Sequence, residues 1–274
     1  MEFYKKRKAK KSGDIYPRYI SCGLTLRIRR ESMKFKTVIL AAGKGTRMES
    51  DLPKVLHKVC DKSMIRHVID NAKEAGATDI CVIVGYKGEL VREEIKDLDV
   101  TIVEQKEQLG TGHAVKCAAD FIGNDGDTLI LCGDTPLIKA ETLKSLYEIH
   151  KKEENGVTVL SALLDDPKGY GRIIRDAAGD FMKITEDKDC TDEERKTKEI
   201  NSGMYVFDSA DLSRSLSLLK NDNVQGEYYL TDTIYIIKDA GKRVNATAVN
   251  DTDEILGVNT KLQLKEAEEI MKRR

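Results

Sequence analysis

The chain has 274 residues, of which 34% are charged and 40% hydrophobic, and its formal net charge at pH 7 is -1. This length allows one large α/β domain or two small ones with a sizeable buried core, and one domain is favoured. The composition is that of a soluble protein, without a stretch apolar enough to cross a bilayer or a general basic surface for nucleic acid. We therefore expect a cytoplasmic protein that binds neither nucleic acid nor membrane.

Residues 1–32 form a basic segment, with ten Lys or Arg against Glu2, Asp14 and Glu31. The segment lacks the continuous apolar region and the small-residue cleavage site of a secretion signal. Met33 opens "MKFKTVIL", which is typical of a natural protein start, so we interpret residues 1–32 as a disordered upstream extension. A tether to nucleic acid or membrane is the alternative. We expect deletion of residues 1–32 to leave activity intact, and a large loss in the truncated protein would contradict this interpretation.

The six cysteines and four histidines are scattered along the chain. None of them has the paired close spacing of a zinc site, so we expect no metal site built from Cys or His. Reduced thiols agree with the expected cytoplasmic location.

The first half of the chain alternates strands and helices. Four apolar runs predict buried strands, namely "TVILAA" (37–42), "ICVIVG" (80–85), "VTIVEQ" (100–105) and "DTLILCGD" (127–134). Helical spacing between them predicts helices in residues 62–76, 88–98 and 112–122. This alternation favours a parallel sheet with right-handed crossovers, in which ligands bind beyond the carboxyl ends of the strands. The rule singles out residues 43–47, residues 105–112 and Asp134.

The second half is less regular. Strands are predicted for 156–164, 200–208 and 244–249, and residues 169–187 read as a hairpin that turns at Ala178 and Gly179. Helical patterns predict a helix over 227–241 and a terminal amphipathic helix over 261–274. We therefore expect an α/β fold with a central, mostly parallel mixed sheet and a C-terminal helix.

The glycine loop after the first strand is the clearest candidate site. Gly43 and Gly45 free the backbone to turn toward an anion, and Arg47 and Lys54 add positive charge. The loop is neither a P-loop nor a dinucleotide fingerprint, because the required Gly-Lys-Ser/Thr and third glycine are absent. Two glycines alone indicate a plain turn, but with Arg47, Pro53 and Lys54 they favour nucleoside triphosphate binding.

Two further segments admit both a structural and a functional interpretation. Asp134 follows an apolar strand, where it can either cap the next helix or hold a magnesium ion beside phosphates. The stretch "QLGTG" carries amide side chains that suit a uracil base, but it also fits a helix start capped by Thr111 with Gly110 and Gly112 as turn residues. The residues alone leave both choices open.

"LAAGKGTRMESDLPKVLH" resembles the signature of the sugar-nucleotide pyrophosphorylases, several branches of which share this loop. Six later segments are similar to the uridyltransferase half of the bacterial N-acetylglucosamine-1-phosphate uridyltransferases: "QKEQLGTGHA", "GDTPLI", "GYGRIIR", "EINSGMYVF", "QGEYYLTD" and "GVNTKLQL". The resemblance covers about residues 34–266. It implies a Rossmann-like three-layer nucleotidyltransferase domain over residues 33–260, followed by a helical arm over 261–274.

The resemblance also implies a reaction. UTP and N-acetylglucosamine 1-phosphate give UDP-N-acetylglucosamine, a cell-wall precursor, and pyrophosphate by magnesium-assisted attack on the α-phosphorus. Arg47 and Lys54 are the implied catalytic cations, and Asp134 and Asn259 are the implied ligands of Mg2+. The implied nucleotide-binding residues are Leu40, Ala41, Ala42, Gly43, Gly45, Thr46, Gln105, Gln108, Gly110 and Thr111. The implied sugar-binding residues are Gly171, Glu186, Asn201, Tyr229 and Thr231.

The chain departs from the family pattern in three respects. Cys132 stands where the family commonly has tyrosine, and Ser202 replaces the usual threonine. No hexapeptide repeat of an acetyltransferase β-helix follows residue 274, so coenzyme A binding and the family's trimer are not expected of this chain, and a monomer is favoured. Two alternatives stay open: a uridylyltransferase for another hexose 1-phosphate such as glucose 1-phosphate, and a non-catalytic nucleotide-binding module.

Overall fold

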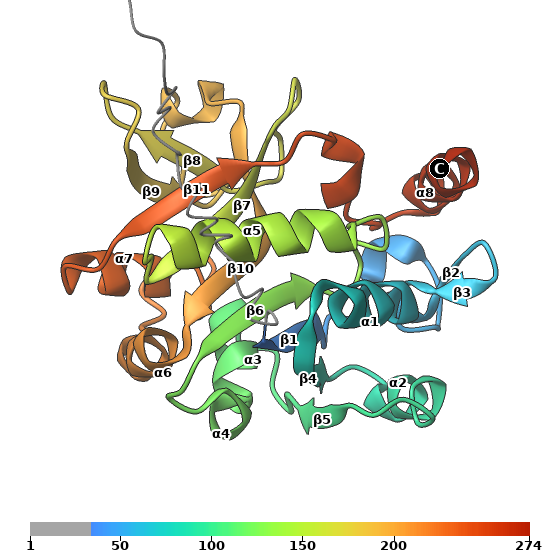
Figure 1. The fold of residues 1–274 in the computed structure, drawn as a ribbon. Coiled ribbons are helices and arrows are strands. Elements are labelled where there is room, and N and C mark those ends of the chain that lie inside the picture. The colour runs from blue at the N-terminus through green and yellow to red at the C-terminus, as the bar shows by residue number, and fades with distance from the viewer. Residues whose placement is uncertain (1–33) are drawn as a thin grey trace, which may run out of the picture. The chain divides into compact units, whose positions relative to one another are not determined.

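The structure, a computed structural model, describes residues 34–274, and the basic segment 1–32 lies outside the described residues. Its centre is a mixed sheet with the strand order β11-β7-β10-β6-β1-β4-β5, to which β8 and β9 attach through β10. Four parallel neighbours form one half of this sheet (Figure 1): β1 (Phe35–Ala41), β4 (Ala77–Val84), β5 (Thr101–Glu104) and β6 (Asp127–Cys132). These are the four strands predicted for the first half, with ends that shift by a few residues.

In the other half of the sheet, β10 reverses direction, while β7 and β11 run the same way as β6. β10 (Glu199–Asp208) runs antiparallel between β6 and β7 (Val157–Leu163), while β11 (Val244–Ala248) runs parallel to β7. β8 (Arg172–Arg175) and β9 (Phe181–Thr185) form the predicted hairpin, and Gly179 takes a left-handed φ of 88° in its turn. The prediction of a mixed, mostly parallel sheet is confirmed.

Helices cover both faces of the sheet because alternate strand residues point to opposite sides. Ile39 of β1 belongs to the apolar core under α1 (Met64–Ala75), α2 (Gly88–Glu94) and α5 (Ala140–Lys152), two of which stand in front of the strands in Figure 1. Val38 belongs to a second core on the other face, under α3 (Thr111–Cys117), α4 (Ala119–Ile122), α6 (Ser209–Leu218) and α7 (Asp232–Asp239). The predicted three-layer α/β arrangement is therefore confirmed.

The predicted helix over 227–241 begins too early, because α7 starts only at Asp232. The backbone before it pairs with the loop that precedes α3: the Tyr228 N–H donates to Leu109 O at 2.9 Å, and Tyr228 O accepts from the Gly112 N–H at 2.8 Å. A residue cannot make these bonds and helical bonds at once. The tertiary pairing therefore displaces the helix start.

The C-terminal helix α8 (Lys261–Arg273) is present as predicted and packs in a third apolar cluster with Val59, Met64, Leu137 and Val258. Thr260 caps its first turn by accepting a hydrogen bond from the Gln263 N–H. The small hairpin beside it and four 3-10 turns complete the elements of the described part: β2 (Lys58–Val59), β3 (Lys62–Ser63), η1 (Thr46–Met48), η2 (Lys54–Leu56), η3 (Glu194–Lys196) and η4 (Thr252–Ile255). Among residues 34–274, no helix has both the length and the apolar character needed to cross a membrane.

Candidate active site

The glycine loop follows β1 at the carboxyl ends of the parallel strands. Gly45 has a left-handed φ of 62°, and a Cβ on it would lie 2.6 Å from Cβ of Lys54. No real Cβ tolerates that distance, so only glycine lets the backbone pass this close to Lys54. The glycine loop and the segment that carries Lys54 are thus packed directly on each other.

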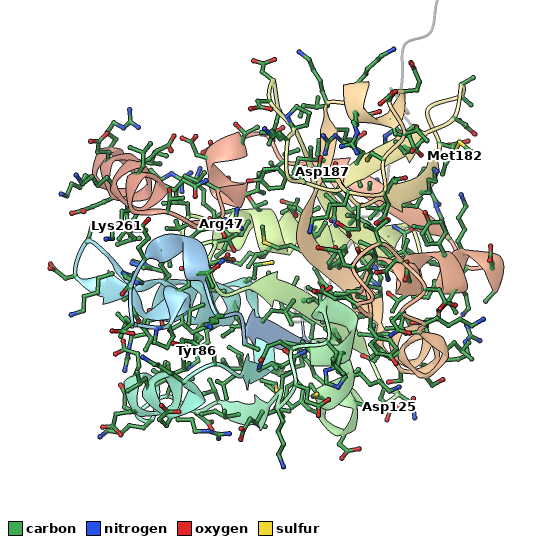
Figure 2. The ribbon with its side chains drawn as sticks, turned by 180° about the vertical axis from the view of Figure 1, so that it is seen from behind. Arg47, Tyr86, Asp125, Met182, Asp187 and Lys261 are labelled. Carbon is green, nitrogen blue, oxygen red and sulfur yellow. The ribbon has the colours of Figure 1, made fainter. Side chains whose placement is uncertain are left out.

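Four predicted residues from distant parts of the chain meet beside this loop. Lys54 Nζ forms an ion pair with Asp134 Oδ2 and donates to Asn259 Oδ1 at 2.9 Å, although Lys54 and Asn259 are 205 residues apart. Arg47, which lies close to the turn before α8 (Figure 2), donates from Nη2 to the same Asn259 oxygen at 3.2 Å. The four residues form a cation–oxygen cluster, the name used below for Arg47, Lys54, Asp134 and Asn259.

Local hydrogen bonds fix the two oxygen donors of this cluster. The Val258 N–H donates to the Asp134 backbone oxygen at 2.9 Å, which ties the two distant segments together. Asn259 Nδ2 donates to Gly257 O at 3.0 Å, so its Oδ1 faces the cations. The alternative role of Asp134 as a helix cap is not observed, because the next helix, α5, starts at Ala140 and its N-cap is Lys139.

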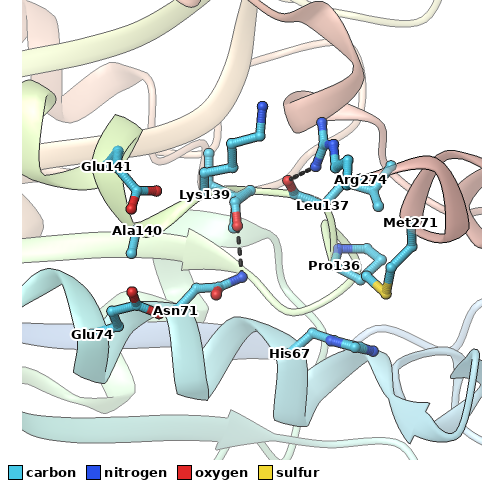
Figure 3. A pocket seen from close by; sticks show the side chains of 11 residues that line it. His67, Asn71, Glu74, Pro136, Leu137, Lys139, Ala140, Glu141, Met271 and Arg274 are labelled. Atoms are coloured by element: carbon cyan, nitrogen blue, oxygen red, sulfur yellow. Dashed lines mark hydrogen bonds between the residues drawn. The ribbon is translucent and has the colours of Figure 1, made fainter.

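The segment that follows Asp134 is restrained by hydrogen bonds from the side chains of Asn71 and Arg274. Figure 3 shows a cavity of about 200 Å³ between α1, α8 and residues 136–139. Asn71 Nδ2 donates to Ile138 O at 2.6 Å, and Arg274 Nη1 donates to Leu137 O at 2.7 Å. Both bonds go to backbone carbonyls, so they restrain the path of the chain that carries Asp134.

A cavity of about 330 Å³ opens beside the cluster. Lys54 and Asp134 line it together with eight of the ten predicted nucleotide residues, namely Leu40, Ala41, Ala42, Gly43, Gln105, Gln108, Gly110 and Thr111. Gly45 and Thr46 do not line it. We refer to it as the nucleotide-side cavity.

Hydrogen bonds among residues 105–110 stabilise the loop before α3. Buried Gln105 donates from Nε2 to Gly110 O at 3.1 Å, and Gln108 Nε2 donates to Gln105 O at 3.1 Å. Thr111 does not cap α3, since its Oγ1 accepts from the Leu230 N–H at 3.1 Å. The threonine therefore joins this loop to the chain before α7.

A second cavity, of about 210 Å³, adjoins the first, and we call it the sugar-side cavity. Four of the five predicted sugar residues line it: Gly171, Glu186, Asn201 and Thr231. Tyr229 does not line it, and its hydroxyl accepts from Gln225 Nε2 at 2.8 Å. The two cavities share the wall residues Leu40, Thr111 and Cys132.

Hydrogen bonds already join the predicted sugar residues to one another. The Thr231 hydroxyl donates to Glu186 Oε1 at 2.9 Å, and the Asn201 N–H donates to Gly171 O at 2.9 Å. Burial raises the pKa of the Glu186 carboxyl, and the negative charges of nearby Asp189 and Asp232 add to this effect, while the Thr231 hydrogen bond opposes it. The Glu186 carboxyl is therefore buried beside a hydroxyl donor and near other carboxylates.

Several lining residues of the sugar-side cavity escaped the sequence analysis as site residues: Tyr170, Gly203, Tyr205 and Leu230. A register shift between Asn201 and Met204 on β10 explains part of this failure, because a β-bulge changes which side chains face the cavity. Gly203, with a left-handed φ of 80°, lies within this bulge. Gly203, two residues after Asn201, is the only signal of this bulge in the sequence.

The α/β fold gathers two cations, a carboxylate and an amide oxygen beside one cavity, and polar groups around a second. These features are typical of the class of group-transfer enzymes that act on phosphorylated nucleotides. A family model described as Nucleotidyl transferase matches residues 36–253. The chain therefore belongs to the nucleotidyl transferase family.

Curated relatives agree with this family, and a solved structure agrees with the fold. The chain is 52% identical over 242 residues to "Bifunctional protein GlmU" of Clostridioides difficile (strain 630), which covers 88% of this chain and 52% of that protein. The protein of the same name from Clostridium acetobutylicum is 53% identical over 238 residues, covering 86% and 52%. The chain thus spans about half the length of these relatives. A structure of UDP-glucose pyrophosphorylase complexed with UDP-glucose has a similar fold, with a TM-score of 0.71 at 21% identity over 88% of this chain and 100% of that chain.

Proposed function

We propose that the chain is a uridylyltransferase that joins UTP and N-acetyl-α-D-glucosamine 1-phosphate to give UDP-N-acetylglucosamine and pyrophosphate. The observation that carries the proposal is the meeting of Arg47, Lys54, Asp134 and Asn259 beside two cavities with a common wall. A nucleotide in one cavity and a sugar phosphate in the other would bring their phosphates together at that wall. The bifunctional relatives, at 52–53% identity, support the choice of substrates.

The reaction needs little acid–base chemistry from the protein. A phosphate monoester has its second pKa near 6, so the attacking oxygen of the sugar phosphate is already largely ionised at neutral pH. The remaining tasks are to align this oxygen with the α-phosphorus and to neutralise the charge that moves onto pyrophosphate. Arg47 and Lys54 are the cations suited to neutralise this charge, because both extend from the glycine-loop side to the side-chain oxygen of Asn259.

The oxygen donors of the cluster suit a magnesium ion. The two oxygen donors of the cluster are the carboxylate of Asp134 and the amide oxygen of Asn259, and both bind Lys54 Nζ. Mg2+ is held by one or two protein oxygens when phosphates and water supply the others, so this donor set fits. When bound, the ion would neutralise phosphate charge at the reacting centre. Asp134 and Asn259 would hold it, and their fixed backbone contacts orient them for this role.

Pyrophosphate release tests the proposal. The purified chain is incubated with UTP, Mg2+ and either N-acetylglucosamine 1-phosphate or glucose 1-phosphate, with and without a chelator. We expect rapid, chelator-sensitive release with the amino sugar and little with glucose 1-phosphate. Release with glucose 1-phosphate alone would overturn the sugar assignment. Absence of release with either sugar would overturn the proposed catalytic function.

A further inference from the structure

Tyr205 of β10 lines the sugar-side cavity but has no role in the reaction proposed above. Its ring is only 2% exposed and packs against Phe207, with the ring centroids 5.6 Å apart. Its hydroxyl accepts a hydrogen bond from Asn201 Nδ2 at 2.7 Å. The ring is thus fixed in the core while the hydroxyl reaches a predicted sugar-binding side chain.

The carboxamide of Asn201 is held at both ends. Its Oδ1 accepts from the Gly203 N–H at 3.1 Å, and its Nδ2 donates to the Tyr205 hydroxyl. Rotating the carboxamide by 180° would turn its NH2 group toward the Gly203 N–H, so that two donors would face each other. The two contacts therefore select one orientation of the amide. They leave one N–H and one oxygen lone pair of Asn201 for another molecule.

The phenol is well suited to hold this amide at all working pH values. Burial raises the pKa of Tyr205 far above its ordinary range, and the nearby Glu186 carboxyl adds to the shift. A neutral hydroxyl keeps its rotating proton, so it can accept from Asn201 while its own proton points elsewhere. A phenylalanine at this position would fill the same core space without the oxygen.

We infer that Tyr205 is a positioning residue of the sugar half of the site: its hydroxyl holds the Asn201 carboxamide so that the remaining N–H and lone pair face a neutral, hydroxyl-bearing or amide-bearing sugar. The inference rests on the proposed function for the identity of that sugar. The hydrogen bond between Tyr205 and Asn201 does not depend on the proposed function.

A double-mutant cycle tests the inference in the full chain. Tyr205→Phe is expected to raise KM for the sugar 1-phosphate about tenfold, with kcat and KM for UTP changed less than about twofold, because one buried hydrogen bond to the amide is lost. In the background of Asn201→Ala, the same Tyr205→Phe change is expected to have almost no further effect on KM. Equal effects in both backgrounds, or no rise in KM, would overturn the positioning role.

Tyr147→Phe is the matched control. Tyr147 is also a buried tyrosine, and its hydroxyl donates to Asp127 Oδ2 at 3.0 Å, but it does not line the sugar-side cavity. We expect it to lower Tm through the lost hydrogen bond while leaving KM for the sugar phosphate unchanged. A similar rise in KM for this control would show that loss of any buried hydroxyl produces the effect, which would overturn the inference.

A substrate-free measurement separates this inference from the proposed function. If the wild type uses glucose 1-phosphate instead, the sugar assignment fails and the cycle is measured with that substrate. If the wild type turns over neither sugar, NMR of the 15N-labelled chain still gives a result. The Asn201 side-chain NH2 signals, identified by their loss in Asn201→Ala, are expected to shift and exchange faster in Tyr205→Phe. Unchanged signals would overturn the inference.

Discussion

The two halves of the site are built in opposite ways. On the nucleotide side, Gly43, Arg47 and Gln108 are exposed and come from loops beyond the parallel strands β1 and β5. On the sugar side, Asn201 and Thr231 are at most 9% exposed and are hydrogen-bonded to other side chains. One half presents charge on exposed loops, and the other presents a prebuilt polar network inside the core.

This difference has an energetic consequence. Exposed cations contribute little to the free energy of unfolding, because water screens them, but they act strongly on a transferring phosphate. Buried hydrogen-bonded groups contribute to both folding and binding, because removing one partner leaves the other without a bond. Substitutions on the nucleotide side should therefore change turnover more than stability, and those on the sugar side should change both.

Lys54→Ala is expected to have the largest effect. Loss of a cation that neutralises the leaving group should lower kcat by roughly 10²–10³-fold. The free energy of unfolding should fall by about 1–3 kcal/mol, since the ion pair with Asp134 is mostly buried, with side chains 16% and 19% exposed, and its loss removes a partner of the carboxylate. Pyrophosphate release and thermal unfolding measure the two quantities. Lys62→Ala, which removes an exposed ion pair with Asp70, is the control and should leave both nearly unchanged. Wild-type turnover in Lys54→Ala would refute the role of this cation.

Gly110→Ala tests the packing where the nucleotide half and the sugar half of the site meet. Gly110 has a φ of 104°, and a Cβ on it would lie 2.6 Å from Tyr228 O, so the substitution should lower the free energy of unfolding by about 2–3 kcal/mol. Gly179→Ala is the matched control, because Gly179 has a φ of 88° but no atom within 4 Å of the added Cβ. The free energy of unfolding of Gly179→Ala should fall by only about 1 kcal/mol. Urea unfolding of both variants gives the comparison, and equal losses would show that the contact with Tyr228 is unimportant.

Glu186→Gln should have a smaller effect that depends on pH. The folded state raises the pKa of Glu186 above its ordinary value of 4.5, so the folded chain binds this proton more tightly than the unfolded chain. The wild type should therefore lose stability relative to Glu186→Gln as pH rises through and above 4.5, and the two Tm values should converge below it. At pH 7 we also expect KM for the sugar phosphate to rise about tenfold.

Thermal unfolding between pH 4 and pH 8 checks the stability part of this prediction. Glu104→Gln is a suitable control, because Glu104 is an exposed carboxylate that pairs with Arg92. A Tm difference between wild type and Glu186→Gln that does not vary with pH would contradict the proposed cause.

The elements that carry the nucleotide half follow from local sequence patterns more directly than those that carry the sugar half, for physical reasons. Apolar runs and glycines mark the parallel strands and the loops after them, and the carboxyl ends of such strands necessarily lie together. The segment 227–231 was misread as helix because its helical pattern competes with tertiary hydrogen bonds to residues 109–112 that no local pattern records. The bulge at Asn201 likewise depends on its partner strand β7.

Two helices were left unassigned although the sequence contains their signals. In α5, Leu143, Leu146, Tyr147 and His150 are buried at the spacing of one helical face. In α6, the serine-rich composition weakens the helical pattern, but Asp208 caps the helix by accepting from the Asp211 N–H at 2.9 Å. Neither helix lines the nucleotide-side or the sugar-side cavity, so the predicted site does not depend on them.

The backbone bond between Val258 and Asp134 also bears on how the enzyme is made. Domains generally fold from the N-terminal side as the ribosome extends the chain. The strands β1, β4, β5 and β6 and the glycine loop emerge early, but Val258 and Asn259 emerge only after the strand β11. A nascent chain can therefore form the nucleotide-side loops before it holds both oxygen ligands.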